Sequence, residues 1–302
     1  MELRTRPYGQ DGVLVAPADG GNGTGVLVLA GSSGRVETER AGLFASAGVS
    51  AALTYRWFGA PGRPAGIWEY PLEAFDAAVG TLAAECDRVV LLGSSKTAEG
   101  FLLYAADDPR IDAVVALAPS HVVWANVGPG PDGRLRPQHS SWSRDGRAVP
   151  FVPYDDDAEA AGDPPAYAPV YAQSLATAAD RVAAATIPVE RFFGDVLVVA
   201  GGDDQVWPAL ASARAVEARR DACGLPTTVV THPGAGHRLI LPGESVPGGG
   251  MRMARGGTDA ADRELGELAW PEILRVLGLP APGGTGRSQG QLRVESRHLR
   301  PA

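Results

Sequence analysis

Short apolar, β-branched runs alternate with longer segments of helical periodicity along most of this chain. Several of the short runs are apolar at consecutive positions, for example Val-Leu-Val-Leu at 26–29 and Val-Val-Leu-Leu at 89–92. Such runs are typical of strands that are covered on both faces, as in a parallel sheet. The alternation therefore predicts an α/β fold, with an open, mostly parallel sheet and helices on both of its faces.

The expected elements can be placed along the chain. We expect strands at residues 12–16, 25–30, 49–55, 88–92, 113–118, 196–200 and 227–231, and helices at 37–47, 71–86, 97–106, 208–223 and 259–277. Because the first two strands are too close in sequence for a helical crossover, we expect them to pair antiparallel. In the last helix we expect Pro271 to produce a kink or a division.

The segment 124–191 interrupts this alternation and is rich in Pro, Gly and Asp. Its Asp145-Gly146 pair is flanked by β-formers and predicts a hairpin. Long irregular insertions in compact domains usually serve as lids or binding loops, and we expect that role here; the alternative is that the segment is disordered. Residues 1–280 are expected to form one domain, and the Gly-, Pro-, Arg- and Ser-rich residues 281–302 a flexible tail.

The formal net charge of the 302 residues is −8, from 27 Lys and Arg against 35 Asp and Glu. This balance argues against a nucleic-acid or anionic-membrane partner and leaves room for a local basic pocket. Cys86 and Cys223 belong to no C-x-x-C pair, so we expect no disulfide framework, no metal site and no cofactor. Neither a signal peptide nor a membrane-spanning stretch is indicated, which favours a cytoplasmic protein.

The strongest local signal for chemistry is Gly93-Ser-Ser95-Lys-Thr97, which joins an apolar strand to a helix. A serine on such a sharp turn projects its hydroxyl above the sheet at a helix N-terminus. Because the backbone is crowded there, small residues are needed two positions before and two after the serine. Ser95 meets this requirement and Ser94 does not. We predict that Ser95 is a nucleophile; the alternative is that it only caps the helix.

A nucleophilic serine needs a base, and the base needs an orienting carboxylate. Downstream, an apolar strand ends in Gly-Gly-Asp203-Asp204, which places a carboxylate at the same edge of the sheet as Ser95. The next strand leads into His232-Pro-Gly-Ala-Gly-His237, where small residues let the imidazole of His237 lean over that edge. The order Ser, Asp, His is the one expected for a triad on a parallel sheet.

These residues also have simpler interpretations. Asp203 or Asp204 could cap the helix that begins near Pro208, and His232 or His237 could be a surface loop residue. Three placements at the right strand ends and in the right order favour the triad over these alternatives. The residues alone leave open which aspartate would orient the base.

An oxyanion hole would need two backbone N–H groups. One is expected from Lys96, the residue after the nucleophile, and the other from the early glycine-rich loop Gly31-Ser32-Ser33-Gly34. Either Ser32 or Ser33 would donate the second hydrogen bond, unless the loop is an ordinary turn. The loop is a poor phosphate-binding candidate, because no Gly-Lys-Ser/Thr follows it.

Over about residues 25–279 the sequence resembles the acyl-CoA thioester hydrolase / bile acid-CoA:amino acid N-acyltransferase family, in its C-terminal α/β-hydrolase domain. The similar segments are Leu92-Gly-Ser-Ser95-Lys96 for the nucleophile, Ile-Pro-Val-Glu-Arg at 187–191 and Gly-Gly-Asp-Asp204-Gln-Val-Trp207 for the acid, Pro233-Gly-Ala-Gly-His237 for the histidine, and Gly256-Gly257 before a helix with Ala269-Trp270 for the ending. The resemblance implies the α/β-hydrolase fold and assigns the acid position to the second aspartate, Asp204.

The sequence also departs from the family pattern. The usual N-terminal β-sandwich domain is expected to be missing, because only a short stretch precedes the first core strand at residue 25. In the family that domain contributes surface near the active-site entrance, so the resemblance does not extend to the range of substrates. The insertion diverges as well, apart from residues 122–127 and 142–149.

The expected function is that of a serine hydrolase that forms an acyl-enzyme on Ser95 and hydrolyses the thioester of an acyl-CoA or of a carrier protein. Serine favours water as the acceptor, because a seryl ester reacts poorly with amines, and the resemblance associates cysteine with amino-acid conjugation. The alternatives are acyl transfer to a small amine or alcohol, a carboxylester or lactone hydrolase, and a non-hydrolytic binding protein or isomerase on the same fold.

The insertion supplies two further sets of candidate residues. Its arginines could bind the phosphates of CoA or could simply be solvated; they are Arg134, Arg136, Arg144 and Arg147. Its aromatic residues could line a pocket or pack the lid; they are Trp124, Trp142, Phe151, Tyr154, Tyr167 and Tyr171. The sequence indicates neither the acyl chain nor the oligomeric state.

Overall fold

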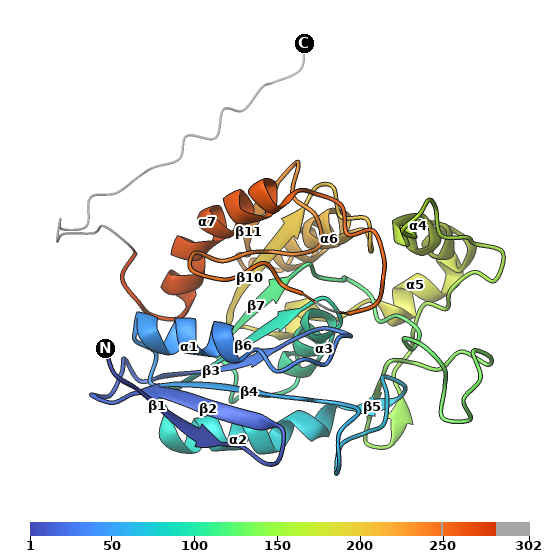
Figure 1. The fold of residues 1–302 in the computed structure, drawn as a ribbon. Helices are drawn as coiled ribbons and strands as arrows, with labels where there is room; N and C mark the ends of the chain where they lie inside the picture. The colour runs from blue at the N-terminus through green and yellow to red at the C-terminus, as the bar shows by residue number, and fades with distance from the viewer. Residues whose placement is uncertain (249, 282–302) are drawn as a thin grey trace.

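The computed structural model describes residues 1–248 and 250–281, and they contain an eight-stranded sheet with the order β1-β2-β4-β3-β6-β7-β10-β11 (Figure 1). Its strands are β1 (Leu3–Pro7), β2 (Gly12–Pro17), β3 (Thr24–Leu29), β4 (Ala51–Tyr55), β6 (Arg88–Ser94), β7 (Ala113–Leu117), β10 (Asp195–Gly201) and β11 (Thr228–His232). From β4 to β11 all neighbours run parallel, and the seven predicted strands are present. The predicted tail, apart from residue 281, lies outside the described residues.

The pairing expected between the first two predicted strands is wrong. Strand β4 lies between them and pairs antiparallel with β2 and parallel with β3, so that Leu53 is opposite both Leu14 and Leu27. Every residue of β4 is buried, whereas β2 is only partly buried. Burial of apolar side chains stabilises a strand such as β4 most when the strand lies inside the sheet. Strand β2 therefore lies nearer the edge, beside β1, which was not predicted.

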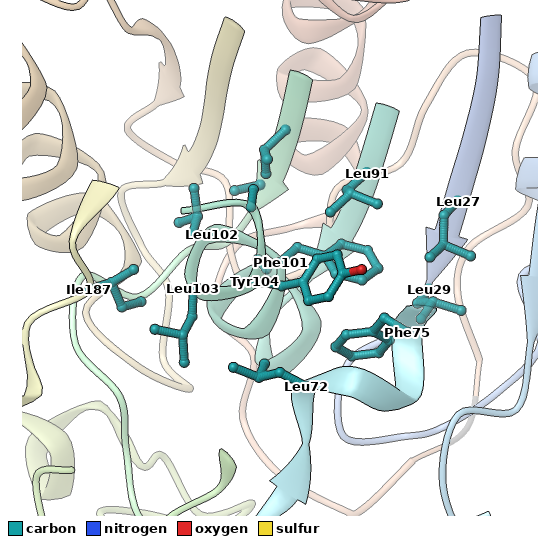
Figure 2. Close-up of a cluster of buried hydrophobic side chains, with 14 of the residues drawn as sticks. Leu27, Leu29, Leu72, Phe75, Leu91, Phe101, Leu102, Leu103, Tyr104 and Ile187 are labelled. Carbon is teal, nitrogen blue, oxygen red and sulfur yellow. The ribbon is translucent and has the colours of Figure 1, made fainter. Parts of the chain in front are cut away.

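Helices cover both faces of the sheet, as predicted. They are α1 (Thr38–Ala47), α2 (Asp76–Glu85), α3 (Lys96–Ala105), α6 (Ala209–Asp221) and α7 (Asp259–Val276). Helices α1 and α7 lie on one face, and α2 lies on the other with α3 and α6 (Figure 1). On the α2–α3 side, the ring centroid of Phe75 is 5.2 Å from that of Phe101. Both rings belong to one buried cluster with Leu27 and Leu29 (Figure 2).

Two helices differ in detail from the expectation. The segment 71–86 begins with a 3₁₀ turn at Leu72–Phe75 before α2 starts. Helix α7 runs through Pro271 without being divided. Proline removes the N–H that would bond to the carbonyl of Glu267, and Glu267 lies on the exposed side of the helix, where water can replace that bond.

The insertion contains the predicted hairpin. Strands β8 (Trp142–Arg144) and β9 (Arg147–Ala148) pair antiparallel, and both turn residues have positive φ, 51° at Asp145 and 69° at Gly146. The short strand β5 (Tyr70–Pro71) adds to this pair. The insertion also forms α4 (Ala168–Thr177) and α5 (Ala179–Ala185), which were not predicted and which lie together to one side of the main sheet in Figure 1.

No helix in the part of the chain that the structure describes is long and apolar enough to cross a bilayer. Two buried clusters of apolar side chains lie on the two faces of the one large sheet. The organisation of residues 1–280 as a single domain stays a prediction.

Candidate active site

Ser95 stands at the turn between β6 and α3 with φ 56° and ψ −116°, a conformation that costs a non-glycine residue free energy. The turn is held by a hydrogen bond from the N–H of Ser95 to the carbonyl of Leu117, at 2.8 Å. A Cβ at Gly93 would lie only 2.6 Å from the carbonyl carbon of Thr97. The close approach of strand and helix therefore requires glycine at 93, as the sequence pattern predicted.

Thr97 occupies the second small position of the turn, where a glycine is more usual. Its hydroxyl donates to the carbonyl of Leu29 at 2.9 Å and accepts from the N–H of Ser94 at 3.0 Å. The side chain is completely buried. Thr97 thus fixes the turn to β3, and the departure from glycine has a structural role.

Asp204 and His237 come together at the same edge of the sheet. The Nδ1 of His237 lies 2.7 Å from Oδ2 of Asp204, while Oδ1 of Asp204 accepts from the N–H of Val206 at 2.8 Å and of Trp207 at 3.2 Å. The carboxylate is therefore fixed by its own loop. With Nδ1 directed at Asp204, Nε2 of His237 is the ring nitrogen available to a substrate or nucleophile.

The two residues left as alternatives lie elsewhere. The carboxylate of Asp203 accepts from the side chain of Gln205 at 2.7 Å and from the N–H of Gly257 at 2.8 Å. His232 lies at the end of β11, with its Nε2 3.0 Å from Glu264. The structure thus separates the two aspartates, and Asp204 alone of the pair contacts His237 among the described residues.

The loops that carry Asp204 and His237 pack backbone against backbone with residues 255–257. A Cβ at Gly236 would lie 2.2 Å from the carbonyl oxygen of Gly256, and one at Gly256 would lie 1.6 Å from the carbonyl oxygen of Asp203. The N–H of His237 also donates to the carbonyl of Arg255 at 2.8 Å. The position of the histidine is therefore set by main-chain contacts on two sides.

The predicted oxyanion residues lie beside Ser95. A Cβ at Gly31 would be 2.8 Å from Cβ of Ser95 and 3.3 Å from the backbone nitrogen of Lys96, so the early loop passes directly over the turn. Ser32 and Ser33 are exposed and line the same cavity as Ser95 and His237. The assignment of the two donors stays a prediction.

The side chain of Lys96 was not predicted to have a role, and Glu99 was not singled out. Lys96 Nζ lies 2.9 Å from Oε2 of Glu99, and both side chains are completely buried beneath the turn. Burial lowers the pKa of Lys96 and raises the pKa of Glu99, and the attraction between the two opposes both shifts. The spacing of three residues on a predicted helix was the available signal for this pair.

A cavity of about 240 Å³ opens beside Ser95. It is lined by Gly31, Ser32, Ser33, Arg35, Arg40, Ser94, Ser95, Leu117, Val127, Val206, His237, Arg238, Leu239, Pro247, Gly250, Met251, Met253 and Arg255. Residues from the early loop, the Ser95 turn and the loop that carries His237 thus share one space. The arginines in this lining were missed, because nothing local in the sequence marks them.

The arginines that the sequence did suggest lie away from this lining. Arg136 pairs with Asp156, and Arg144 pairs with Asp107. Arg134 is exposed and lies 3.9 Å from Asp132, and Arg147 is exposed in β9. None of the four is among the described residues that line the cavity beside Ser95, and their binding of CoA phosphates stays a prediction.

The aromatic residues of the insertion pack against one another and against the sheet. Trp124 stacks on Tyr154 at 6.0 Å and meets Tyr171 edge-on at 4.7 Å, and Tyr171 in turn contacts Trp207. Among the described residues that line the cavity, Val127 comes from the insertion and the six aromatic candidates are absent. The aromatic cluster places the insertion beside the Asp204 loop.

In the described part of the chain, no group of His, Cys, Asp and Glu is arranged to hold a metal ion.

The family described as "BAAT / Acyl-CoA thioester hydrolase C terminal" matches residues 71–275, and no curated protein has a significantly similar sequence. Among solved structures, a putative dienelactone hydrolase from Klebsiella pneumoniae is 14% identical with a TM-score of 0.51, over 92% of this chain and 99% of that one. Puromycin hydrolase is 16% identical with a TM-score of 0.55, over 93% of this chain and 40% of that one. Acylaminoacyl peptidase from Pyrococcus horikoshii is 10% identical with a TM-score of 0.52, over 95% and 42%. These likenesses show that the fold is that of the α/β hydrolases.

Proposed function

The chain belongs to the BAAT / acyl-CoA thioester hydrolase C-terminal family, and from this premise we propose that it hydrolyses acyl thioesters through Ser95, Asp204 and His237. Membership of this family and the α/β-hydrolase fold support an enzyme of the serine-hydrolase type. The observation that carries the proposal is the 2.7 Å contact between Asp204 and His237, at the edge of a cavity that Ser95 also lines.

Ser95 is the nucleophile in this proposal. Its Oγ attacks the acyl carbonyl while Nε2 of His237 takes the hydroxyl proton, so that a C–O bond forms and the carbonyl electrons move to oxygen. Asp204 accepts the hydrogen bond from Nδ1 of His237, which fixes the tautomer of the imidazole and stabilises its positive form. The backbone geometry of the turn at Ser95 supports this role, because it is maintained at a cost.

The tetrahedral oxyanion would be held by the N–H of Lys96 and by an N–H of Ser32 or Ser33. Each such donor contributes roughly 3 kcal/mol to stabilisation of the transition state. The close approach of Gly31 to Ser95 and to the backbone nitrogen of Lys96 supports this arrangement. A side chain at residue 31 would collide with the Ser95 turn and would keep the loop of Ser32 and Ser33 away from it. Collapse of the intermediate breaks the C–S bond, and His237 returns its proton to the leaving thiolate.

Water then attacks the acyl-enzyme while His237 again accepts a proton. His237 gives that proton to Oγ of Ser95 as the bond from the acyl carbon to the serine oxygen breaks and the carboxylic acid is released. A serine at this position favours water over an amine, since an oxygen ester is a weaker acyl donor than a thioester. The thiol of the substrate would be CoA or the phosphopantetheine of a carrier protein, and this choice is part of the proposal. Transfer to a small amine or alcohol and hydrolysis of oxygen esters are the competing outcomes.

Labelling with a serine-directed fluorophosphonate tests the nucleophile. We expect one adduct per chain, which peptide mass spectrometry should map to Ser95. Ser95→Ala should form no adduct, and His237→Ala should be labelled much more slowly. His232→Ala is the matched control and should label as the parent protein does, because His232 contacts Glu264 outside the cavity. A protein without an adduct at Ser95 would contradict the enzyme proposal.

The substrate class is tested by comparing kcat/KM for acyl-CoA thioesters with kcat/KM for p-nitrophenyl esters of the same acids. We expect thioesters to be preferred, with the free acid as the product detected by mass. A preference for oxygen esters by orders of magnitude would favour the carboxylester or lactone hydrolase instead. Formation of an amide or ester when glycine, taurine or glycerol is added would favour the acyltransferase.

A further inference from the structure

The two edge strands of the main sheet differ in how well they are protected. At one edge, β1 carries Arg4 and Arg6 at exposed positions and ends in the exposed Pro7. Charged side chains and proline on an edge strand discourage it from pairing with another chain. At the other edge, β11 reads Thr-Val-Val-Thr-His over residues 228–232, without Lys, Arg, Asp, Glu or Pro. Strand β11 therefore lacks the features that block strand pairing.

Strand β11 is partly exposed along its whole length. Each of its residues is half-buried, and in the part of the chain that the structure describes β10 is the one strand that pairs with it. The carbonyl of His232 accepts from the N–H of Gly202, in the loop after β10, at 2.9 Å. Because backbone groups alternate in direction along a strand, those of Val230 also point towards β10. Those of Val229 and Thr231 point outward.

Helix α7 lies along β11 and runs in the opposite direction (Figure 1). At one end of the strand, Glu264 lies 3.0 Å from Nε2 of His232. At the other end, Arg275 donates to Oγ1 of Thr228, also at 3.0 Å. The helix rises about 16 Å between these two residues, and the strand spans about 13 Å, so the two elements match in length. The side of α7 next to β11 thus has an acidic end and a basic end.

An exposed leucine lies between these two ends. Leu268 is on the same side of α7 as Glu264 and Arg275, because steps of four and seven residues return to nearly the same side of a helix. Its exposed fraction is 53%, which is high for a large apolar side chain. Trp270, about 200° farther around the helix, stacks on Phe44 of α1 at 6.0 Å. That contact leaves Leu268 facing away from α1, on the side of the sheet edge.

A second copy of β11 is the partner that fits the backbone of this edge. When two copies run antiparallel about a two-fold axis at Val230, Val229 of each copy lies opposite Thr231 of the other. Both residues have outward-pointing N–H and C=O groups, so they can exchange hydrogen bonds. Val230 packs against the buried cluster on the α1–α7 face, so the two Val230 side chains meet on the side of α7.

The same axis brings opposite charges together. The basic end of the α7 side of one copy approaches the acidic end of the other, which places Arg275 near Glu264 of the second copy. The two Leu268 side chains then lie near the axis, between these charges. Arg275 also pairs with Glu272 on its own helix at 2.9 Å, and a guanidinium has several donors for such shared contacts. The surface is therefore complementary to itself, as a two-fold interface requires.

We propose that this chain forms a dimer in which β11 pairs antiparallel with β11 of a second copy. The two main sheets then form one continuous sheet, with the two α7 helices side by side on one face. Hydrogen bonds between Val229 and Thr231 set the register, and contact between the Leu268 side chains removes apolar surface from water. Attraction between Arg275 and Glu264 favours the antiparallel orientation.

Sedimentation velocity of the full chain, at about 1 to 100 μM, tests for the dimer. We expect the parent protein to be dimeric. Leu268→Asp places two like charges near the axis and should raise the Kd of the dimer by at least about 100-fold. Leu135→Asp alters another exposed leucine, in the insertion, and is the matched control, which should stay dimeric. A monomeric parent protein, including one that binds a different protein at this edge, overturns the proposal. So does a dimer that Leu268→Asp leaves intact.

Charge reversal tests the orientation of the two copies. Glu264→Arg and Arg275→Glu each place like charges opposite one another at two symmetric positions, and each should raise the Kd about 10- to 100-fold. A mixture of the two variants should associate as the parent does, because every facing pair in the mixed dimer is again of opposite charge. Both side chains are exposed, and circular dichroism checks that the variants fold. A mixture that associates no better than the separate variants contradicts the antiparallel arrangement.

Hydrogen exchange at single amides tests the strand pairing itself. In the parent dimer the amides of Val229 and Thr231 should exchange at least about tenfold more slowly than in monomeric Leu268→Asp. The amide of Val230 points towards β10 and should exchange at a similar rate in both. Equal rates at Val229 and Thr231 in the two proteins would show that the copies meet without pairing their strands, which overturns the proposal.

Discussion

Trp142 in the insertion donates its indole N–H to Oε1 of Glu99 on helix α3, at 2.8 Å. The other oxygen of that carboxylate lies 2.9 Å from Nζ of Lys96, and the N–H of Trp124 also bonds to Glu99, at 3.2 Å. A single buried carboxylate therefore joins the residue next to Ser95 to the insertion. The link makes the position of the insertion dependent on the charge pair below the turn.

Removing the charge of either Lys96 or Glu99 alone should lower the free energy of unfolding far more than removing both charges. Glu99→Gln keeps acceptors for the tryptophans but leaves Lys96 buried without its counter-ion, and should lower the free energy of unfolding by about 3–5 kcal/mol. Lys96→Met combined with Glu99→Gln should recover most of this loss. Urea unfolding of the single and double variants measures the effect, and additive losses would contradict this account of the pair.

Replacement of Ser95 by glycine should stabilise the protein while it abolishes turnover. Glycine relieves the strain of φ 56° at this position, whereas alanine keeps it. We expect the free energy of unfolding of the Ser95→Gly variant to be about 1 kcal/mol higher than that of the Ser95→Ala variant. This difference corresponds to roughly 2–4 °C in Tm. Thermal melting followed by circular dichroism makes the comparison. Equal melting temperatures would indicate that the turn relaxes in solution.

The neighbouring aspartates offer a matched pair of variants. Asp204→Asn should reduce kcat by roughly 10⁴-fold, because the amide no longer favours the tautomer of His237 that accepts a proton. Asp203→Asn keeps an oxygen for the N–H of Gly257 and should change kcat far less. Steady-state kinetics on one thioester, with both variants checked for folding, decides between them. The reverse order would move the acid role to Asp203.

The two cysteines should differ in reactivity. Burial, aided by Glu85 and Asp87, raises the pKa of the Cys86 thiol to about 11, whereas Cys223 is exposed. Below pH 11 Cys86 is mainly protonated, so its alkylation by iodoacetamide should be slow at pH 8 and should accelerate about tenfold per pH unit. Peptide mass spectrometry over time measures both sites, with Cys86→Ser as the control. Equal rates at pH 8 would show that the protein exposes Cys86 readily.

The sequence predicted the strands and the tight turn at Ser95 well, because both depend on local patterns. The apolar runs, the small residues around Ser95 and the Asp145-Gly146 turn are short-range signals, and each is present in the fold. The order of strands at the start of the sheet was not predictable in the same way. It depends on which strand is more deeply buried, and burial of Leu53 is settled only when the whole sheet assembles.

The arginines at the cavity were missed for a related reason. Arg35 and Arg255 are far apart in the sequence, and they meet only because the segment before α7 folds over the histidine loop. Composition identified 27 basic residues without indicating which would gather. The arginines of the insertion looked like a cluster because they are close in sequence, yet Arg136 and Arg144 are paired with separate acidic residues.

The loops of Asp204 and His237 pack so closely against residues 255–257 that only glycine fits at several positions, and this has a consequence for redesign. Two of its members, Gly256 and Gly257, have φ of 68° and 65°, and both meet neighbouring backbone where a methyl group would stand. These three segments form one interlocked module, so grafting the acid and histidine loops into another scaffold would require moving the third segment with them. Randomised libraries that spare these glycines would leave the frame of the module intact.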